Sequence, residues 1–141
     1  VASVATQAGI RETRRIKGVH TMTAEEYMSG YRYEDSISRG AHPIDIHATK
    51  GSSQVTHFLE QAAYVPYRAL IANDYPNLLV AGRCLSADRK AFASMRVQAS
   101  CMGTGQAAGV AAAMCAKAGC SVQSVDIGAL VERLKALGAA L

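Results

Sequence analysis

Arginine side chains give this sequence its clearest potential for chemistry. The run RETRRIK at residues 11–17 holds several of them close together, and others follow singly along the chain. A guanidinium group binds a carboxylate through two parallel hydrogen bonds, so clustered arginines are typical of a site for an anionic ligand. Solvated surface positions are the competing interpretation, because most arginines lie on protein surfaces. The candidates from this pattern are Arg11, Arg14, Arg15, Arg68, Arg83 and Arg96.

A second candidate group lies in the run AHPIDIH at residues 41–47. His42 and His47 are an odd number of residues apart, so in a strand they point to opposite faces, and the residues predict no shared metal ion. Asp45 and His47 lie on the same face, where the carboxylate could orient the histidine as an acid or base. Ordinary polar residues on a surface strand are the alternative, and the residues alone favour it.

A third candidate is the glycine-rich stretch MGTGQAAG at residues 102–109. If a helix begins here, its free N–H groups and positive dipole end would attract an anionic or electron-rich ligand atom. The spacing G-x-G-x-x-x-G differs from the dinucleotide fingerprint G-x-G-x-x-G and does not directly follow a strand. Close packing of a small-residue helix against a neighbour explains the glycines equally well.

Composition places these candidates in one folded domain. The chain has 141 residues, of which 50% are hydrophobic, so a disordered protein is excluded. Its net charge is +4, without a run of five like charges, and this balance does not predict a nucleic-acid partner. The first residues hold no apolar signal segment, so a cytoplasmic location is expected. Cys84, Cys101, Cys115 and Cys120 lack zinc-site spacing, and we interpret them as small core residues.

Three strands, a short helix and a turn are expected to position the polar groups. Thr23 and Glu26 predict the capping box of a short helix that ends at Gly30, and a second turn is expected from Glu34 to Arg39. Alternation predicts a strand at 41–48, and β-rich composition predicts another at 64–72. The apolar run NLLVAG at 77–82 is typical of a strand buried on both faces.

Two longer helices complete the expected elements. The segment 102–118 predicts the longest helix, and its small residues share one face that a neighbouring backbone could approach closely: Gly105, Ala108, Gly109, Ala112 and Ala116. Residues 97–116 carry no charge, so a membrane span is the alternative, but their polar side chains and lack of large aliphatic ones favour a helix packed on a sheet. An amphipathic helix is expected from the cap at Asp126 to Gly138.

Five stretches, taken together and in order, resemble one protein family. They are similar to the carboxy-terminal portion of FAD-dependent oxidoreductases of the glutathione-reductase-like superfamily, especially a bacterial branch of large FAD-dependent oxidoreductases. The resemblance covers about residues 9–138. The stretches are RETRRIKG (11–18), AHPIDIH (41–47), VPYRALI (65–71), NLLVAGRCLSA (77–87) and SMRVQASCMGTGQAAGVAAAM (94–114).

The resemblance implies a fold and a division of the chain. The fold would be α/β or α+β, with residues 1–72 in part of a substrate-cap region and residues 73–141 in the carboxy-terminal part of an FAD-binding domain. The amino-terminal dinucleotide-binding βαβ unit of the family has no counterpart, because no strand is directly followed by G-x-G-x-x-G. Together with the start at Val1, this absence leads us to expect a piece of a longer protein, whose missing amino-terminal part is its first partner.

The resemblance also implies roles for individual residues. Residues matching positions around the cofactor are Ala81, Gly82, Arg83, Arg96, Met102, Gly103, Thr104, Gly105 and Gln106. Residues matching polar positions towards the substrate are Arg11, Arg14, His47 and Arg68. One difference from the branch concerns the segment between strand and helix, which often reads Ser-Ala-Thr-His there and reads Ser86-Ala87-Asp88-Arg89 here, so that an arginine replaces a potential acid–base histidine.

The function implied is hydride transfer between flavin and a small anionic organic substrate. FAD is expected in the full-length protein and not in this chain alone, which we expect to be inactive and to self-associate. Neither a metal nor a nucleic-acid or membrane partner is expected. A flavin-dependent oxygenase of the hydroxylase type and a non-enzymatic binding domain with a degenerate flavin fold are the alternatives.

Overall fold

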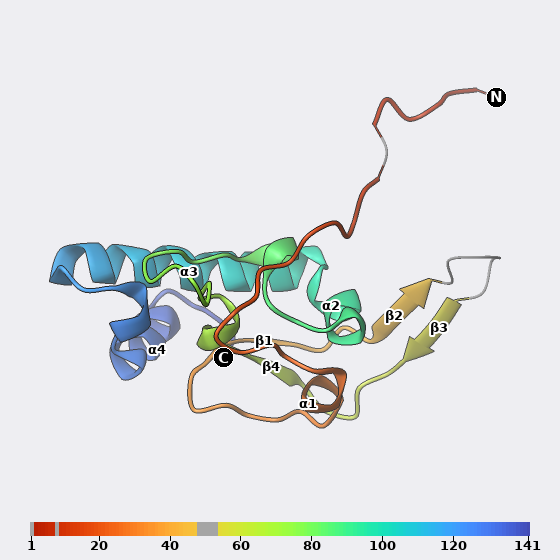
Figure 1. The fold of residues 1–141 in the computed structure, drawn as a ribbon. Helices are drawn as coiled ribbons and strands as arrows, with labels where there is room; N and C mark the ends of the chain where they lie inside the picture. The colour runs from red at the N-terminus through yellow and green to blue at the C-terminus, as the bar shows by residue number, and fades with distance from the viewer. Residues whose placement is uncertain (1, 8, 48–53) are drawn as a thin grey trace.

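Helices and short antiparallel sheets make up the fold. The computed structural model describes residues 2–7, 9–47 and 54–141. The helices are α1 (Ala24–Met28), α2 (Arg89–Met95), α3 (Gln98–Ala118) and α4 (Ile127–Ala136), and the strands are β1 (Ser36–Gly40), β2 (Ile44–His47), β3 (Gln54–His57) and β4 (Ala63–Pro66). Short 3₁₀ helices cover Tyr67–Ala69, Gly82–Cys84 and Val122–Ser124. Figure 1 shows α3 as a long rod along one side, with α1 and the β1–β4 pair below it. The expected mixture of helices and strands is confirmed.

Both sheets are two-stranded and antiparallel. In one sheet β1 pairs with β4, with Gly40 opposite Ala63 and an irregularity between Ser36 and Ser38. In the other, β2 pairs with β3, with Ile44 opposite His57. The strand expected at 41–48 is therefore confirmed over residues 44–47.

The turn expected from Glu34 to Arg39 is wrong, because most of this segment is strand β1. Its central residues Ile37 and Ser38 are buried, with only 1% and 5% of their surface exposed. Contact with β4 and α3 thus outweighs the local turn preference of a segment rich in polar residues.

The strand expected at 64–72 is confirmed only over residues 64–66, since β4 ends at Pro66 and a 3₁₀ turn follows. Asp35 explains the change of direction. Its backbone oxygen accepts a hydrogen bond from Tyr67 N at 2.8 Å, and its carboxylate accepts one from Arg68 N at 2.9 Å. A side chain that binds backbone N–H groups competes with a sheet ladder for the same donors.

The buried strand expected at 77–82 is wrong. This segment forms a single antiparallel bridge, Ile71 to Leu79, which the backbone bonds Ala72 N to Leu78 O and Val80 N to Leu70 O make, before a 3₁₀ turn begins at Gly82. Leu78 is 43% exposed. An apolar run is buried on both faces only when strands and helices surround it, and the described residues supply a neighbour along one edge alone.

The capped helices are confirmed. Thr23 and Glu26 form the predicted capping box of α1, and Gly30 follows with a left-handed φ of 63°. In α4, the Asp126 side chain accepts a hydrogen bond from Ala129 N, and Leu130 and Leu134 bury the apolar face. The helix expected at 102–118 is also confirmed as the longest, although it begins at Gln98.

Helix α2 was not expected, and one carboxylate marks its start. Asp88 Oδ1 accepts a hydrogen bond from Ala91 N of α2 at 2.8 Å, while Oδ2 accepts one from Ala24 N of α1 at 2.7 Å. The same side chain therefore satisfies free N–H groups at the amino ends of two helices. Phe92, on α2, is fully buried in the core between these elements.

No helix in the described part of the chain combines the length and the apolar character that a membrane span requires. The longest, α3, buries Ser100, Thr104, Ala107, Ala111 and Cys115. These residues recur every three or four positions, so they form one face of the helix.

Candidate functional site

Two residues expected near a cofactor are brought together by a hydrogen bond. Gly82 N donates to the Thr104 hydroxyl oxygen at 3.1 Å, and that hydroxyl donates in turn to Ser100 O at 2.9 Å. Thr104 is fully buried, and Gly82 has a φ of 66°, a conformation that favours glycine. The 3₁₀ turn Gly82–Cys84 is thereby fixed against the first turns of α3.

The expectation that residues 102–106 form the amino end of a helix is wrong. Helix α3 starts at Gln98 with Val97 as its cap residue, and its first internal bond runs from Cys101 N to Val97 O. The N–H groups of 102–106 therefore lie inside the hydrogen-bonded ladder, and the free N–H groups belong to residues 98–100. This start has no capping signal in the sequence, because a valine side chain such as that of Val97 cannot accept a capping hydrogen bond.

The candidate residues of α3 point in different directions around the helix. Thr104 faces Gly82, whereas Gly103 packs so closely on Ser38 of β1 that a Cβ atom there would overlap the serine oxygen. Met102 is 74% exposed, and Gly105 has no neighbouring atom within 4 Å of a built Cβ. Met102, Gly105 and Gln106 are thus the members of this group that face outward.

The small residues of α3 lie on its outer face, so the expected packing of this face against a neighbour is wrong for the described residues. Gly105, Gly109, Ala112 and Ala116 are exposed, and only Ala108 is half-buried. A built Cβ at Gly109 also meets no atom within 4 Å. Glycine and alanine therefore form an uncharged stripe on this face of the helix, beyond the outward Met102.

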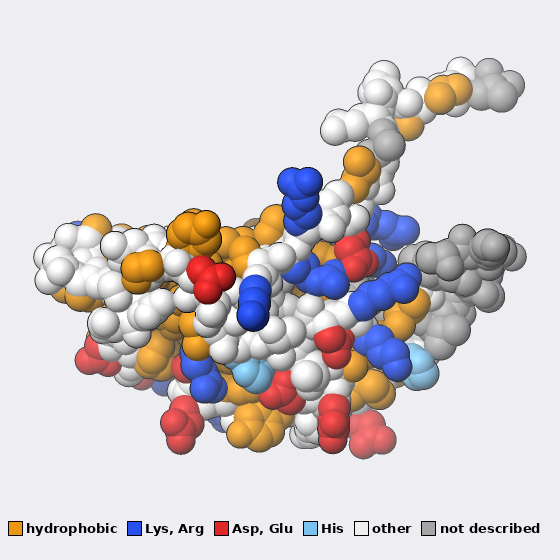
Figure 2. Space-filling model, viewed as in Figure 1, with side chains coloured by type: hydrophobic (Ala, Val, Ile, Leu, Met, Phe, Trp, Pro, Cys, Tyr) orange, Lys and Arg blue, Asp and Glu red, His pale blue; other side chains and the backbone are white. Residues whose placement is uncertain are grey.

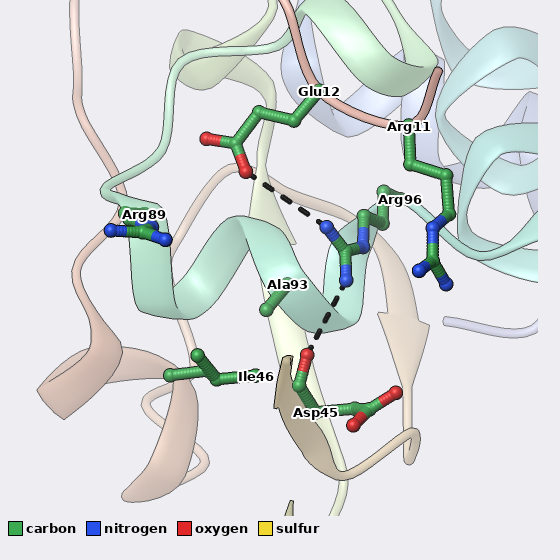
Figure 3. A pocket seen from close by; sticks show the side chains of 7 residues that line it. All are labelled: Arg11, Glu12, Asp45, Ile46, Arg89, Ala93 and Arg96. Carbon is green, nitrogen blue, oxygen red and sulfur yellow. Dashed lines mark hydrogen bonds and ion pairs between the residues drawn. The ribbon is translucent and has the colours of Figure 1, made fainter. Parts of the chain in front are cut away.

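A pocket with several charged side chains lies where the amino-terminal segment crosses α2 and β2. Figure 2 shows basic side chains gathered at the base of the amino-terminal extension, with acidic ones among them. The pocket has a volume of about 80 Å³. Its lining residues, drawn in Figure 3, are Arg11, Glu12, Asp45, Ile46, Arg89, Ala93 and Arg96.

Arg96 occupies the centre of this pocket. Its guanidinium lies between Glu12 and Asp45, with Arg89 and Arg11 on either side of it in Figure 3. It donates a hydrogen bond of 3.4 Å to Asp45 O and is 3.9 Å from a Glu12 carboxylate oxygen. The Arg96 side chain is only 14% exposed. A guanidinium with five donors is therefore held in a partly buried place by two long contacts.

Arg15 forms a second ion pair with Glu12. Its guanidinium forms an ion pair with the Glu12 carboxylate and also lies over the ring of Phe92, 4.9 Å from the ring centroid. Arginine stacks readily on aromatic faces, so Phe92 helps to fix this part of the amino-terminal segment. Glu12 thus contacts Arg15 and Arg96 from one position.

Arg68 lies apart from the pocket. It donates to both carboxylate oxygens of Asp35, from Nε at 3.0 Å and from Nη2 at 3.2 Å. Hydrogen bonding to Asp35 raises the pKa of Arg68 and keeps it charged. The structure therefore separates Arg68 from Arg11 and Arg96, and a carboxylate of the chain itself already fills its fork.

The remaining substrate-side candidates do not join the pocket either. Arg14 is exposed and is not among the lining residues. The His47 side chain lies outside the described part of the structure. His42 Nδ1 is 2.8 Å from Pro43 O. Arg83 donates to Ile10 O at 3.1 Å and so ties the 3₁₀ turn to the amino-terminal segment.

The cysteines are only partly core residues. Cys115 is buried and Cys101 is half-buried, whereas Cys84 and Cys120 are exposed. Burial raises the pKa of the Cys101 thiol, although nearby Arg83 lowers it, and burial also raises the pKa of Cys115. Among residues 2–7, 9–47 and 54–141, no three His, Cys, Asp or Glu side chains are grouped as a metal site would need.

Sequence reasoning missed Glu12, Asp45 and Arg89 as partners of Arg11 and Arg96 in one pocket. A signal for α2 was present, because an aspartate precedes a run of helix-forming residues at 89–95. With that helix recognised, the seven-residue spacing of Arg89 and Arg96 would have placed both on one helical face. The contact with β2 depends on tertiary packing alone.

Comparison with known proteins gives one family. The family model described as FAD dependent oxidoreductase matches residues 1–134. No curated protein and no solved structure matches the chain.

Proposed function

Because the chain belongs to the family of FAD-dependent oxidoreductases, we propose that it acts within a flavoprotein that transfers hydride between flavin and a small anionic organic substrate. The structural observation that supports this proposal is the uncharged outer face of α3, which begins beside the turn Gly82–Cys84. Open glycine positions on such a face allow a flat ring to approach the helix backbone.

The residues present fit the cofactor at this face. Ala81 and Arg83, beside the fixed Gly82, and the outward Met102, Gly105 and Gln106 would contact the flavin half of FAD. Bound FAD supplies the hydride-accepting ring. The chain's own contribution is to leave the space above Gly105 and Gly109 open, to hold the turn at Gly82 in place through Thr104, and to hold a negatively charged substrate through arginine.

We further propose that the ADP half of FAD is bound by protein outside these residues. In the dinucleotide-binding fold that the family resemblance implies, the ADP half lies on a βαβ unit, whose strands are parallel. Both sheets among the described strands are antiparallel, so they supply no such unit. The partly exposed segment 77–80 and the outer face of α3 offer surfaces for such a missing part. Under this proposal residues 1–72 belong to the substrate-cap region and residues 73–141 to the FAD-binding domain.

The proposal is tested by reducing the full-length flavoprotein with candidate anionic substrates in the absence of oxygen. Bleaching of the flavin absorbance by substrate alone is the expected result, because hydride moves to the flavin ring without any other oxidant. The oxygenase alternative predicts a different result. The substrate alone would not bleach the flavin, but flavin reduced by an external reductant would react with oxygen and the substrate would be oxygenated. A full-length protein that binds no flavin would support the non-enzymatic alternative.

Gly105 offers a sharper test of the proposed flavin face. In the full-length flavoprotein, Gly105→Val is expected to weaken FAD binding more than tenfold, i.e. by more than about 1.4 kcal/mol, because the new side chain would occupy the space of the ring. The stability of the polypeptide should change little, since a Cβ at this position meets no atom of the chain within 4 Å. FAD titration followed by thermal unfolding measures both.

Ala112→Val provides the matched control for this variant. Ala112 lies on the same exposed face two helical turns further along, so this variant places the same valine side chain on the helix surface there. FAD affinity should stay at the level of the unmodified protein. Equal FAD affinity in both variants would place the flavin elsewhere.

A further inference from the structure

The charge balance of the pocket around Arg96 is incomplete. Two carboxylates, from Glu12 and Asp45, line it together with three guanidinium groups. Glu12 is already engaged by Arg15. Arg11 and Arg89 make no hydrogen bond or ion pair with any residue in the described part of the chain. The pocket therefore carries an excess of positive charge.

Arg96 itself has bonding capacity to spare. Its side chain is 14% exposed, so most of its water contacts are lost, yet its contacts to Asp45 O and Glu12 are 3.4 and 3.9 Å long. Hydrogen bonds from a guanidinium to an oxyanion are shorter, at about 2.7–2.9 Å. A partly buried charge with weak partners gains most from an additional anion.

The size of the pocket limits what that anion is. Its volume of about 80 Å³ is well below the roughly 300 Å³ and more of pockets that enclose whole drug-sized ligands. It has room for one carboxylate or phosphate group, with the rest of the ligand outside. The planar guanidinium fork matches both kinds of group in geometry.

We infer that Arg11, Arg89 and Arg96 bind the carboxylate or phosphate group of a small ligand, and that this ligand is the substrate if the proposed function holds. Arg96 is the central donor, and Arg11 and Arg89 approach from either side. Glu12 competes with the ligand for Arg96. Arg14 and Arg68 take no part in this site, because neither lines the pocket and Arg68 already holds Asp35.

The test is calorimetric titration of the 141-residue chain with phosphate, with succinate and with the uncharged succinamide, in the absence of flavin. Phosphate and succinate should saturate a single site, and the tighter of the two identifies the group that the pocket prefers. Succinamide should not bind. Binding of the amide as strongly as the acid, or of none of the three, would overturn the inference.

Variants connect the binding to the pocket. Arg96→Lys should lower affinity at least tenfold because it keeps the charge and loses the fork. Arg89→Gln, at an exposed position that leaves the fold intact, should also lower it severalfold. Glu12→Gln should raise it, since a competing carboxylate disappears. Arg133→Gln, on the exposed side of α4, is the control and should have no effect.

Competition with FAD and riboflavin separates this site from the cofactor. Neither should displace the bound anion, because the pocket is lined by none of the residues of the outer α3 face. Displacement by FAD and not by riboflavin would show that the arginines hold the cofactor's phosphates, and would overturn the inference. Affinity that is unchanged in both arginine variants would do the same. A failure to find flavin in the full-length protein would contradict the proposed function and leave this anion measurement intact.

Discussion

The 141-residue chain, purified in the presence of excess FAD, is expected to be colourless. The outer face of α3 and the turn at Gly82 offer contacts to the flavin half of the cofactor only. The charged diphosphate and the adenosine would remain in water, without the helix amino end that binds them in dinucleotide-binding folds. Each tenfold loss of affinity corresponds to about 1.4 kcal/mol, and the loss of half of the ligand's contacts should amount to several such steps.

A visible spectrum and a sizing column measure this prediction together. The column should show self-association, because Leu78 and Met102 are exposed by 43% and 74% and the segment 77–80 has an open edge. Full-length protein prepared in the same way is the control and should be yellow. A yellow monomer of the chain, with one FAD per molecule, would show that these residues form a complete flavin-binding unit.

Phe92→Ala is expected to lower the free energy of unfolding by about 3–5 kcal/mol, the usual range for removing a buried aromatic side chain. Phe92 is fully buried and belongs to the main hydrophobic core. The ring also supports the Arg15 guanidinium, so its loss should loosen the amino-terminal segment next to Glu12. Urea unfolding followed by circular dichroism gives the size of the effect.

Phe58→Ala is the matched control, since it removes the same side chain from a position that is 78% exposed. Its unfolding midpoint should lie close to that of the unmodified chain. Equal midpoints for the two variants would mean that Phe92 does not stabilise the core.

The Phe92 variant should also bind phosphate and succinate more weakly, because Arg15 loses the ring that supports it next to Glu12.

Elements fixed by short-range contacts could be predicted from the sequence. The helix α1 follows from Thr23 and Glu26, which cap it within four residues, and α4 follows from Asp126 and a regular apolar face. Such caps act on N–H groups of their own helix, so no distant residue needs to be known.

Elements that depend on distant partners could not be predicted in the same way. The run 77–82 has the composition of a buried strand, but the described residues do not surround it. The turn after Pro66 is set by Asp35, far away in sequence. For the candidate site, the clustering of arginines in the sequence predicts a site for an anion, and this stays a prediction. Only the packing of α2 on β2 shows that Arg96 and Arg89 join Arg11 in one pocket and that Arg68 does not.

The shared cap at Asp88 restricts which substitutions this surface position can accept. Its two carboxylate oxygens serve one helix each, Ala91 N in α2 and Ala24 N in α1. Asparagine, serine and threonine each offer a single acceptor oxygen in place of the two that the carboxylate provides. Variation in a lineage of such chains should therefore be low at this turn. Any change that did become fixed there would need compensation in two helices at once.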